Sequence, residues 1–191
     1  MRKDGKGGAN TKTGAAFEVK SILQAAIKNL SDYEVRRAKI GVEILYKGSV
    51  VAHSYKQHDL YKFLESKNVN YKDYISAKLL PDDAIVVVDS KRVTIVEIKY
   101  QETPGSVDEK PQTADFKKRQ YEKLFTPLKY EVAFIYVFST WFKDERYKDM
   151  LGYVKSVGCD YYFEELPLSA LGLPGGEDID VEEVADESGK K

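Results

Sequence analysis

Residues 79–100, LLPDDAIVVVDSKRVTIVEIKY, contain two β-branched runs separated by a short polar stretch. The runs span residues 84–88 and 93–98, and two such runs around a polar turn predict a β-hairpin. The polar stretch consists of Asp89, Ser90, Lys91 and Arg92. The second run is apolar on both alternating sides, which is typical of a strand in the middle of a sheet. We therefore expect the core to form around this hairpin.

The loop length of the hairpin decides which polar side chains share a face. If the loop holds two residues or four, residues whose numbers sum to 181 face each other, so that Asp82 lies opposite Lys99 and Ala84 opposite Glu97. Asp82, Glu97 and Lys99 then point to one side of the pair. A three-residue loop would shift the pairing by one residue and put Asp83 in the place of Asp82.

Three ionisable groups at the end of a buried strand need partners, because an unpaired charge near the core is costly. A cation and a phosphate would neutralise them. We expect Asp82 and Glu97 to bind Mg²⁺, with Mn²⁺ as a substitute, because hard carboxylate oxygens suit these ions. Lys99 is expected to orient a water or to stabilise the charge that develops in the transition state. The alternative is a solvated strand edge with cross-strand ion pairs.

The order Pro81-Asp82, fourteen residues, then Glu97-Ile98-Lys99 resembles the signature of the PD-(D/E)XK nucleases. Residues 7–18, 105–125 and 156–173 look like segments of small type II restriction endonucleases. The resemblance implies an α/β fold, with a restriction-endonuclease-like αβββαβ core in which helices flank a central mixed β-sheet. It also implies Mg²⁺-dependent hydrolysis of phosphodiester bonds in double-stranded DNA at a specific sequence, and a cognate DNA methyltransferase encoded beside the chain.

The resemblance assigns roles residue by residue. Asp82 and Glu97 match the metal ligands, and Lys99 matches the catalytic lysine. Glu18 matches an acidic residue on the first helix, expected here over residues 15–30, and Gln101 matches a polar residue near the scissile phosphate. Their alternatives are an ordinary glutamate on a helix flank and a surface glutamine at a strand end. The exonuclease branch carries Gln-x-x-x-Tyr on the next helix, where this chain has Lys117-x-x-x-Tyr121.

Residues 112–125 are expected to form that next helix. Its apolar side chains span about half the circumference, and Lys117 and Gln120 fall inside this arc, pointing toward the active-site end. The loop before the helix is a candidate for base contacts. The candidate DNA-binding residues are Lys12, Ser106, Lys110, Gln112, Lys117, Lys118 and Arg119. The alternative for the helix is a charged face toward water.

Charge divides the chain into three parts. Residues 1–14 carry four basic residues and one acid among glycines, and are expected to form a flexible basic arm along the DNA backbone. Residues 15–173 are expected to form one nuclease domain. Residues 174–191 hold seven acids and two lysines, a net −5, so residues 1–173 carry −1 minus −5, or +4. Such an acidic end predicts a disordered tail.

Cys159 is the single cysteine, which excludes an internal disulfide and a zinc ribbon. No segment has the long apolar run of a membrane span or a signal peptide. We therefore expect a soluble protein in the cytoplasm, without a membrane partner.

The remaining elements follow from periodicity and turn residues. A second hairpin is expected over residues 39–54, around Lys47-Gly48. Further helices are expected at 58–66, 71–78 and 143–157, and strands at 131–139 and 160–163.

Three functions are compatible with these patterns. A site-specific endonuclease acting as a homodimer is favoured, because a two-fold protein matches a palindromic site. A structure-specific nuclease for DNA repair or recombination is the first alternative. The second is a non-catalytic nucleic-acid-binding module that retains the fold, against which the intact Asp82, Glu97 and Lys99 argue.

Overall fold

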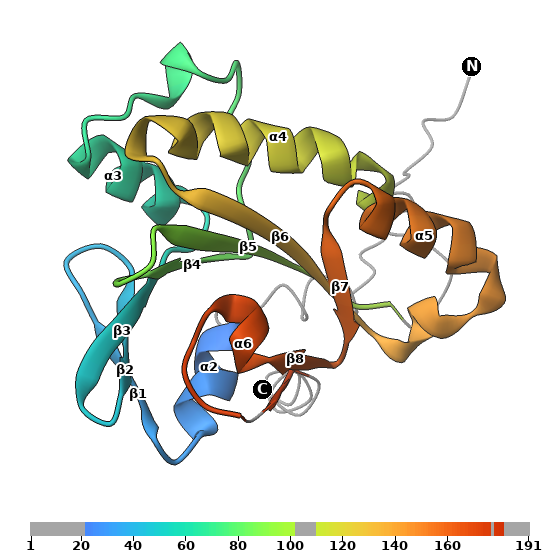
Figure 1. Ribbon diagram of the computed structural model, residues 1–191, viewed down its shortest axis with the longest axis horizontal. Helices are drawn as coiled ribbons and strands as arrows, with labels where there is room; N and C mark the ends of the chain where they lie inside the picture. Colours follow the sequence, from blue (N-terminus) through green and yellow to red (C-terminus); the bar gives the residue numbers. More distant parts are fainter. Residues whose placement is uncertain (1–21, 102–109, 177, 182–191) are drawn as a thin grey trace, which may run out of the picture.

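The computed structural model of the protein describes residues 22–101, 110–176 and 178–181. A seven-stranded sheet runs through it, and its strands follow one another in chain order (Figure 1). They are β1 (Tyr33–Arg37), β2 (Val42–Tyr46), β3 (Ser49–Ser54), β4 (Asp83–Val87), β5 (Arg92–Lys99), β6 (Glu131–Phe138) and β7 (Asp160–Phe163). Neighbours from β1 to β5 are antiparallel, whereas β5, β6 and β7 are parallel. The expected α/β class with a mixed central sheet is confirmed.

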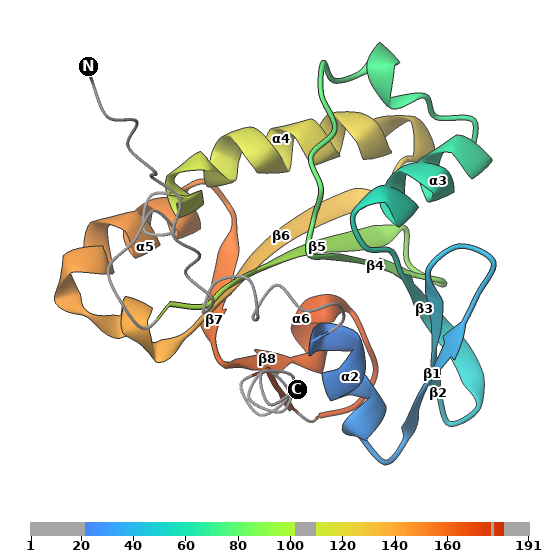
Figure 2. The ribbon, with the colours of Figure 1, turned by 180° about the vertical axis from the view of Figure 1, so that it is seen from behind.

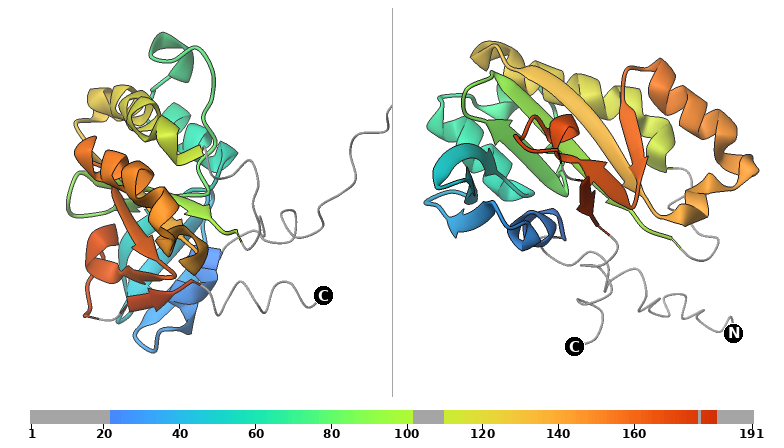
Figure 3. Two further views of the ribbon diagram at one scale, coloured as in Figure 1. Left: turned by 90° about the vertical axis from the view of Figure 1, so that its right-hand side faces the viewer. Right: turned by 60° about the horizontal axis from the view of Figure 1, so that its bottom comes forward.

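Helices cover both faces of the sheet (Figures 1 and 2). One face carries α3 (His58–Ser66), α4 (Ala114–Phe125) and α5 (Lys148–Ser156); α4 and α5 also make the crossovers between the parallel strands. The other face carries α2 (Ile22–Asn29), α6 (Leu168–Leu171) and a small sheet of β8 (Glu165–Pro167) and β9 (Asp178–Asp180), seen best in Figure 3. In the described ranges, no helix has the length and apolar character needed to span a bilayer.

Strand β5 lies in the interior of the sheet, between β4 and β6. Val93 and Ile95 pack into the core beneath α3 and α4, and Val96 packs into the second core, beneath α2 and α6. The expectation of a central strand, apolar on both sides, is therefore confirmed. Its alternation places Glu97 on the α4 side, next in line after Val93 and Ile95.

The hairpin of β4 and β5 has an even loop, but its register differs by two residues from the expected one. Asp83 pairs with Val96 and Val86 with Val93, so that numbers sum to 179 rather than 181. Arg92 belongs to β5 and not to the turn, because it pairs with Glu131 of β6; its Nη2 also donates to the carbonyl of Ala170, 2.9 Å away. A shift of two keeps every side chain on its expected face, so the faces are correct.

One local expectation is wrong, and a second is confirmed only from Lys148 onward. The helix expected over residues 71–78 is only a 3₁₀ turn at Tyr71–Asp73, because the Tyr61 hydroxyl holds both the N–H and the carbonyl of Leu79 at 2.7 Å. The helix expected over residues 143–157 begins as two 3₁₀ turns, Thr140–Lys143 and Glu145–Tyr147, before α5. Strand β1 had no counterpart among the expected elements.

The expected boundary of the acidic tail at residue 174 is also wrong. Residues Asp178–Asp180 form β9, which pairs with β8, and both Ile179 and Val181 are buried. The carbonyl of Pro174 accepts a hydrogen bond from the Tyr33 hydroxyl. Two apolar side chains among the acids are thus enough to attach this segment to the domain.

Gly41, between β1 and β2, has a positive φ of 64° and a close neighbour. A Cβ there would collide with the carbonyl oxygen of Ser54 and lie 2.8 Å from Cδ1 of Tyr55. We expect Gly41→Ala to lower the free energy of unfolding by about 3 kcal/mol, because alanine is strained in the left-handed region and its Cβ overlaps neighbouring atoms. Gly48 also has a positive φ but nothing within 4 Å, so Gly48→Ala is expected to cost about 1 kcal/mol. Urea unfolding measures both; equal losses would contradict the steric contribution.

Candidate active site

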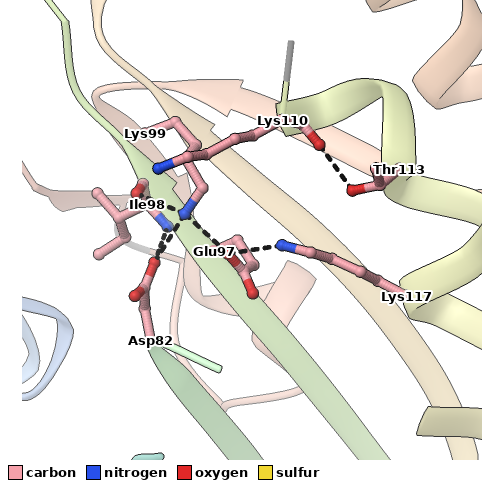
Figure 4. A network of polar contacts seen from close by, with 7 residues as sticks. All are labelled: Asp82, Glu97, Ile98, Lys99, Lys110, Thr113 and Lys117. Carbon is pink, nitrogen blue, oxygen red and sulfur yellow. Dashed lines mark hydrogen bonds and ion pairs between the residues drawn. The ribbon is translucent and has the colours of Figure 1, made fainter. Parts of the chain in front are cut away.

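The three side chains singled out in residues 79–100 meet at the start of β4 and the end of β5 (Figure 4). The Lys99 Nζ lies 3.1 Å from Oδ2 of Asp82 and 2.7 Å from Oε2 of Glu97. The backbone N–H of Ile98 also donates to Oδ2 of Asp82, at 2.8 Å. One lysine therefore connects two carboxylates that come from neighbouring strands.

The hairpin register explains this arrangement. The residue numbers of paired positions in the hairpin sum to 179, so Asp82, just before the first residue of β4, lies opposite Glu97. Lys99 comes two residues after Glu97 on β5 and therefore shares its face. The backbone N–H of Gln57 donates to the carbonyl of Pro81 at 3.1 Å, which fixes the approach to β4. The site is thus built on strands, which position side chains more rigidly than loops do.

Asp83 points to the opposite face, so Asp82 and not Asp83 is the aspartate that lies beside Glu97 and Lys99. The Ser54 hydroxyl donates to Oδ1 of Asp83 at 2.6 Å, and the N–H of Ala84 donates to the same oxygen at 2.9 Å. Nε2 of Gln24 on α2 in turn donates to the Ser54 hydroxyl at 2.6 Å. The remaining Oδ2 of Asp83 is buried without a partner in the described part of the chain.

A fourth charged side chain enters from helix α4. The Lys117 Nζ lies 3.3 Å from Oε2 of Glu97, the same oxygen that Lys99 contacts (Figure 4). The expectation that Lys117 points toward the active-site end is therefore confirmed. With two carboxylates and two ammonium groups, the formal charges of Asp82, Glu97, Lys99 and Lys117 cancel.

Exposure increases from the floor of the site to its rim. The side chain of Glu97 is 7% exposed and that of Lys99 11%, whereas Lys117 and Asp82 are 21% and 39% exposed. Burial opposes the charge of Lys99, but the carboxylates of Glu97 and Asp82 outweigh it and raise the pKa of Lys99 above its ordinary value. Lys99 is therefore an ammonium group at neutral pH.

Two buried tyrosines border Glu97 and were not expected there. Tyr136 on β6 is in register with Glu97, and Tyr121 follows Lys117 by one turn of α4. Neither hydroxyl has a hydrogen-bond partner among the described residues. Burial, followed by the charge of Glu97, raises the pKa of both tyrosines, so both remain neutral donors. The four-residue spacing from Lys117 was the signal in the sequence that could have found Tyr121.

The other predicted residues of this helix region divide into two groups. Lys110 and Gln112 are exposed on the 3₁₀ turn Lys110–Thr113, and the side chain of Lys110 is directed toward the same end of β5 (Figure 4). Lys118 instead donates to the carbonyl of Gly158 at 2.8 Å, and Arg119 pairs with Asp115 at 2.8 Å. Lys118 and Arg119 are therefore not brought to the site.

Phe116 and Gln101 differ from their expected surroundings. Phe116, assigned to the apolar arc of the helix, is 58% exposed, because α4 turns this position outward. Gln101 is buried, so it is not a surface glutamine at a strand end. Its backbone N–H donates to the Ser139 hydroxyl at 3.1 Å, and that hydroxyl donates to the backbone carbonyl of Gln101 at 2.9 Å. Three other candidates, Lys12, Glu18 and Ser106, lie outside the described residues.

The donor set decides which metal the site fits. Within the described ranges, no three or more His, Cys, Asp or Glu side chains are grouped as metal ligands would be. A zinc or calcium cage built by the described residues is therefore not present. Mg²⁺ needs only one or two carboxylates, because it keeps several waters and takes the rest of its ligands from substrate phosphates. Asp82 and Glu97 fit that requirement.

Asp83 gives the protein a testable pH dependence. Burial raises the pKa of Asp83 from 3.8 to about 6, although the hydrogen bond from Ser54 opposes the shift. The pKa of Asp83 is higher in the folded than in the unfolded protein, so the contribution of Asp83 to the free energy of unfolding is largest below pH 4. This contribution is lost as the pH rises through 6. We expect Asp83→Asn to remove this loss, which is on the order of 3 kcal/mol. Urea unfolding from pH 4 to 7 tests it, with exposed Asp89→Asn as the control; parallel pH profiles for wild type and Asp83→Asn would contradict it.

Comparisons of this chain with protein families, curated proteins and solved structures found no match. Any functional conclusion therefore depends on the residues of the chain itself and on the way the fold groups them.

Proposed function

We propose that the protein is a Mg²⁺-dependent endonuclease of the PD-(D/E)XK type, which hydrolyses double-stranded DNA at a specific sequence as type II restriction endonucleases do. The observation that carries the proposal is the group of Asp82, Glu97 and Lys99, in which one ammonium contacts both carboxylates at 3.1 and 2.7 Å. Two carboxylates in a partly buried site can hold the metal for phosphodiester cleavage, and a lysine beside them can stabilise the charge that develops on the phosphate.

The order of elements supports the same proposal. Helix α2 is followed by the five antiparallel strands β1 to β5, with α3 inserted between β3 and β4, then by α4 and by β6, which is parallel to β5. Strands β3, β4 and β5 with α4 and β6 correspond to the βββαβ part of an αβββαβ core, and β1 and β2 are additional to it. The proposed site lies where that core joins its second and third strands.

Each residue has a definite task in the proposed reaction. Asp82 and Glu97 would hold Mg²⁺, which when bound polarises a phosphoryl oxygen and lowers the pKa of a nearby water. Lys99 carries its proton at neutral pH, and its three N–H groups point to Asp82, Glu97 and the carbonyl of Ile98. With Mg²⁺ on the two carboxylates, one of these N–H groups would turn to the attacking water or to a phosphate oxygen. The apolar core below Glu97 excludes bulk water and strengthens these interactions.

Charge favours an anionic substrate. The four charged side chains cancel without a metal, so a divalent cation would leave a formal charge of +2 at the site. A phosphodiester would neutralise part of it. We assign contacts with the DNA backbone to Lys110, Gln112 and Lys117, which lie on the rim or reach the site. Two copies related by a two-fold axis would cut both strands of a palindromic sequence.

Digestion of plasmid DNA tests this proposal. With Mg²⁺ or Mn²⁺ we expect discrete bands that disappear on addition of EDTA, and sequencing the ends of the fragments would define the recognition site. Cutting confined to branched or flapped DNA would favour a structure-specific repair or recombination nuclease instead. Binding of DNA without cleavage under both metals would favour a non-catalytic module.

A further inference from the structure

The two lysines of the site contact the same carboxylate oxygen but are held differently. Lys99 is 11% exposed and has three oxygen partners: Oδ2 of Asp82, Oε2 of Glu97 and the carbonyl of Ile98. Lys117 is more exposed and forms its ion pair with Oε2 of Glu97 at the longer distance of 3.3 Å. Of the two ammonium groups, Lys117 is therefore the one that can leave.

We infer that Lys117 is an internal counter-ion that metal displaces: it neutralises Glu97 in the metal-free protein and is released to a phosphate of the bound DNA when Asp82 and Glu97 take a divalent cation. This inference rests on the proposed function. It assigns Lys117 a different task from Lys99, which stays between the two carboxylates.

Electrostatics supply the driving force. A divalent cation and an ammonium group compete for the same oxygen of Glu97, and like charges a few ångströms apart repel strongly where water is scarce. Lys117 reaches the site from α4 on a flexible four-carbon side chain, so its ammonium can move toward the rim without a change of backbone. The rim is where Lys110 already points (Figure 4).

The surroundings of Glu97 are prepared for such an exchange. The hydroxyls of Tyr121 and Tyr136 are buried beside Glu97 and have no partner among the described residues. Buried polar groups without a partner are rare and usually mark a place where a water or an ion binds. When Lys117 leaves, these hydroxyls remain as donors for a water that enters beside Glu97.

Titration calorimetry with Mn²⁺, on the full chain without DNA, tests the first half of the inference. We expect Lys117→Gln to bind Mn²⁺ about tenfold more tightly than wild type, because a competing charge is removed. Lys117→Arg keeps the charge and should bind as wild type does. Lys123→Gln, an exposed lysine on the same helix, controls for the change in net charge. Thermal unfolding shows whether each variant is folded.

Cleavage at saturating Mn²⁺ tests the second half. We expect Lys117→Gln to cut plasmid about ten- to a hundredfold more slowly than wild type despite binding metal more tightly. Unchanged or weaker Mn²⁺ affinity in Lys117→Gln overturns the inference, and so does an unchanged cleavage rate. If wild type cuts DNA but Lys117→Gln shows no gain in Mn²⁺ affinity or no loss of cleavage rate, the role of Lys117 is wrong and the proposed function stands. If wild type neither binds Mn²⁺ nor cuts DNA, the proposed function fails and the inference with it.

Discussion

Replacement of Lys99 by methionine is expected to abolish metal-dependent cleavage, lowering the single-turnover rate by at least about 1,000-fold. Methionine fills a similar volume but removes the ammonium that lies between Asp82 and Glu97. The developing charge on the phosphate would lose its donor, and the water would lose its orientation. Asp82→Ala is expected to cause a comparable loss, because one of two metal ligands disappears.

The matched control is Lys91→Met, which makes the same exchange at an exposed position of the turn between β4 and β5. Its cleavage rate should equal that of wild type. Circular dichroism must show that all three variants are folded, since only then does lost cleavage report on the site. Undiminished cutting by Lys99→Met or Asp82→Ala would show that the site assignment is wrong.

Glu97→Gln is expected to destabilise the metal-free protein by about 4 kcal/mol. Glu97 is 7% exposed, and its Oε2 accepts from both lysines. Lys117 can turn to solvent after the exchange, but Lys99 cannot, and it would keep only Asp82 as a charged partner. Removal of one member of a buried ion pair is costly because the other remains charged and desolvated. Urea unfolding in EDTA at pH 7 measures the loss.

A double variant tests whether the unpaired charge of Lys99 causes this loss of stability. If uncompensated charge causes the loss, Glu97→Gln combined with Lys99→Met should recover most of the stability, because no buried ammonium remains. Glu122→Gln on α4 is the control: Glu122 is half-exposed and 3.9 Å from Lys118, so its removal should change stability by less than about 0.5 kcal/mol. A double variant as unstable as Glu97→Gln would mean that the loss does not arise from an unpaired charge on Lys99.

Much of the candidate site was predictable because it depends on local rules. A strand alternates its side chains, so Glu97 and Lys99 must share a face whatever the rest of the fold does. An even loop then brings Asp82, and not Asp83, to that face. Helical spacing likewise predicted that Lys117 points the same way as the apolar residues of its helix.

The register and the far partners were not predictable from local rules. The hairpin register differs by two residues from the expected one, and Arg92, expected in the turn, is instead paired with Glu131 of β6. Residues 71–78 do not form a helix beyond Tyr71–Asp73 because Tyr61 holds Leu79. The acidic end joins the domain because Ile179 and Val181 find an apolar surface. In each case a contact between distant segments outweighed a preference of the local sequence.

The amino-acid sequence by itself determined the central hairpin and the shared face of Glu97 and Lys99, and it limited the third group to Asp82 or Asp83 according to whether the loop is even or odd. Backbone geometry alone dictates these, since alternation and loop parity need no knowledge of the neighbours. Only the tertiary structure decided that Lys99 and Lys117 meet on one oxygen of Glu97, and that the hydroxyls of Tyr121 and Tyr136 on the adjoining α4 and β6 are buried without partners among the described residues. Those contacts depend on where α4 and β6 dock on β5, which the packing of the whole core sets.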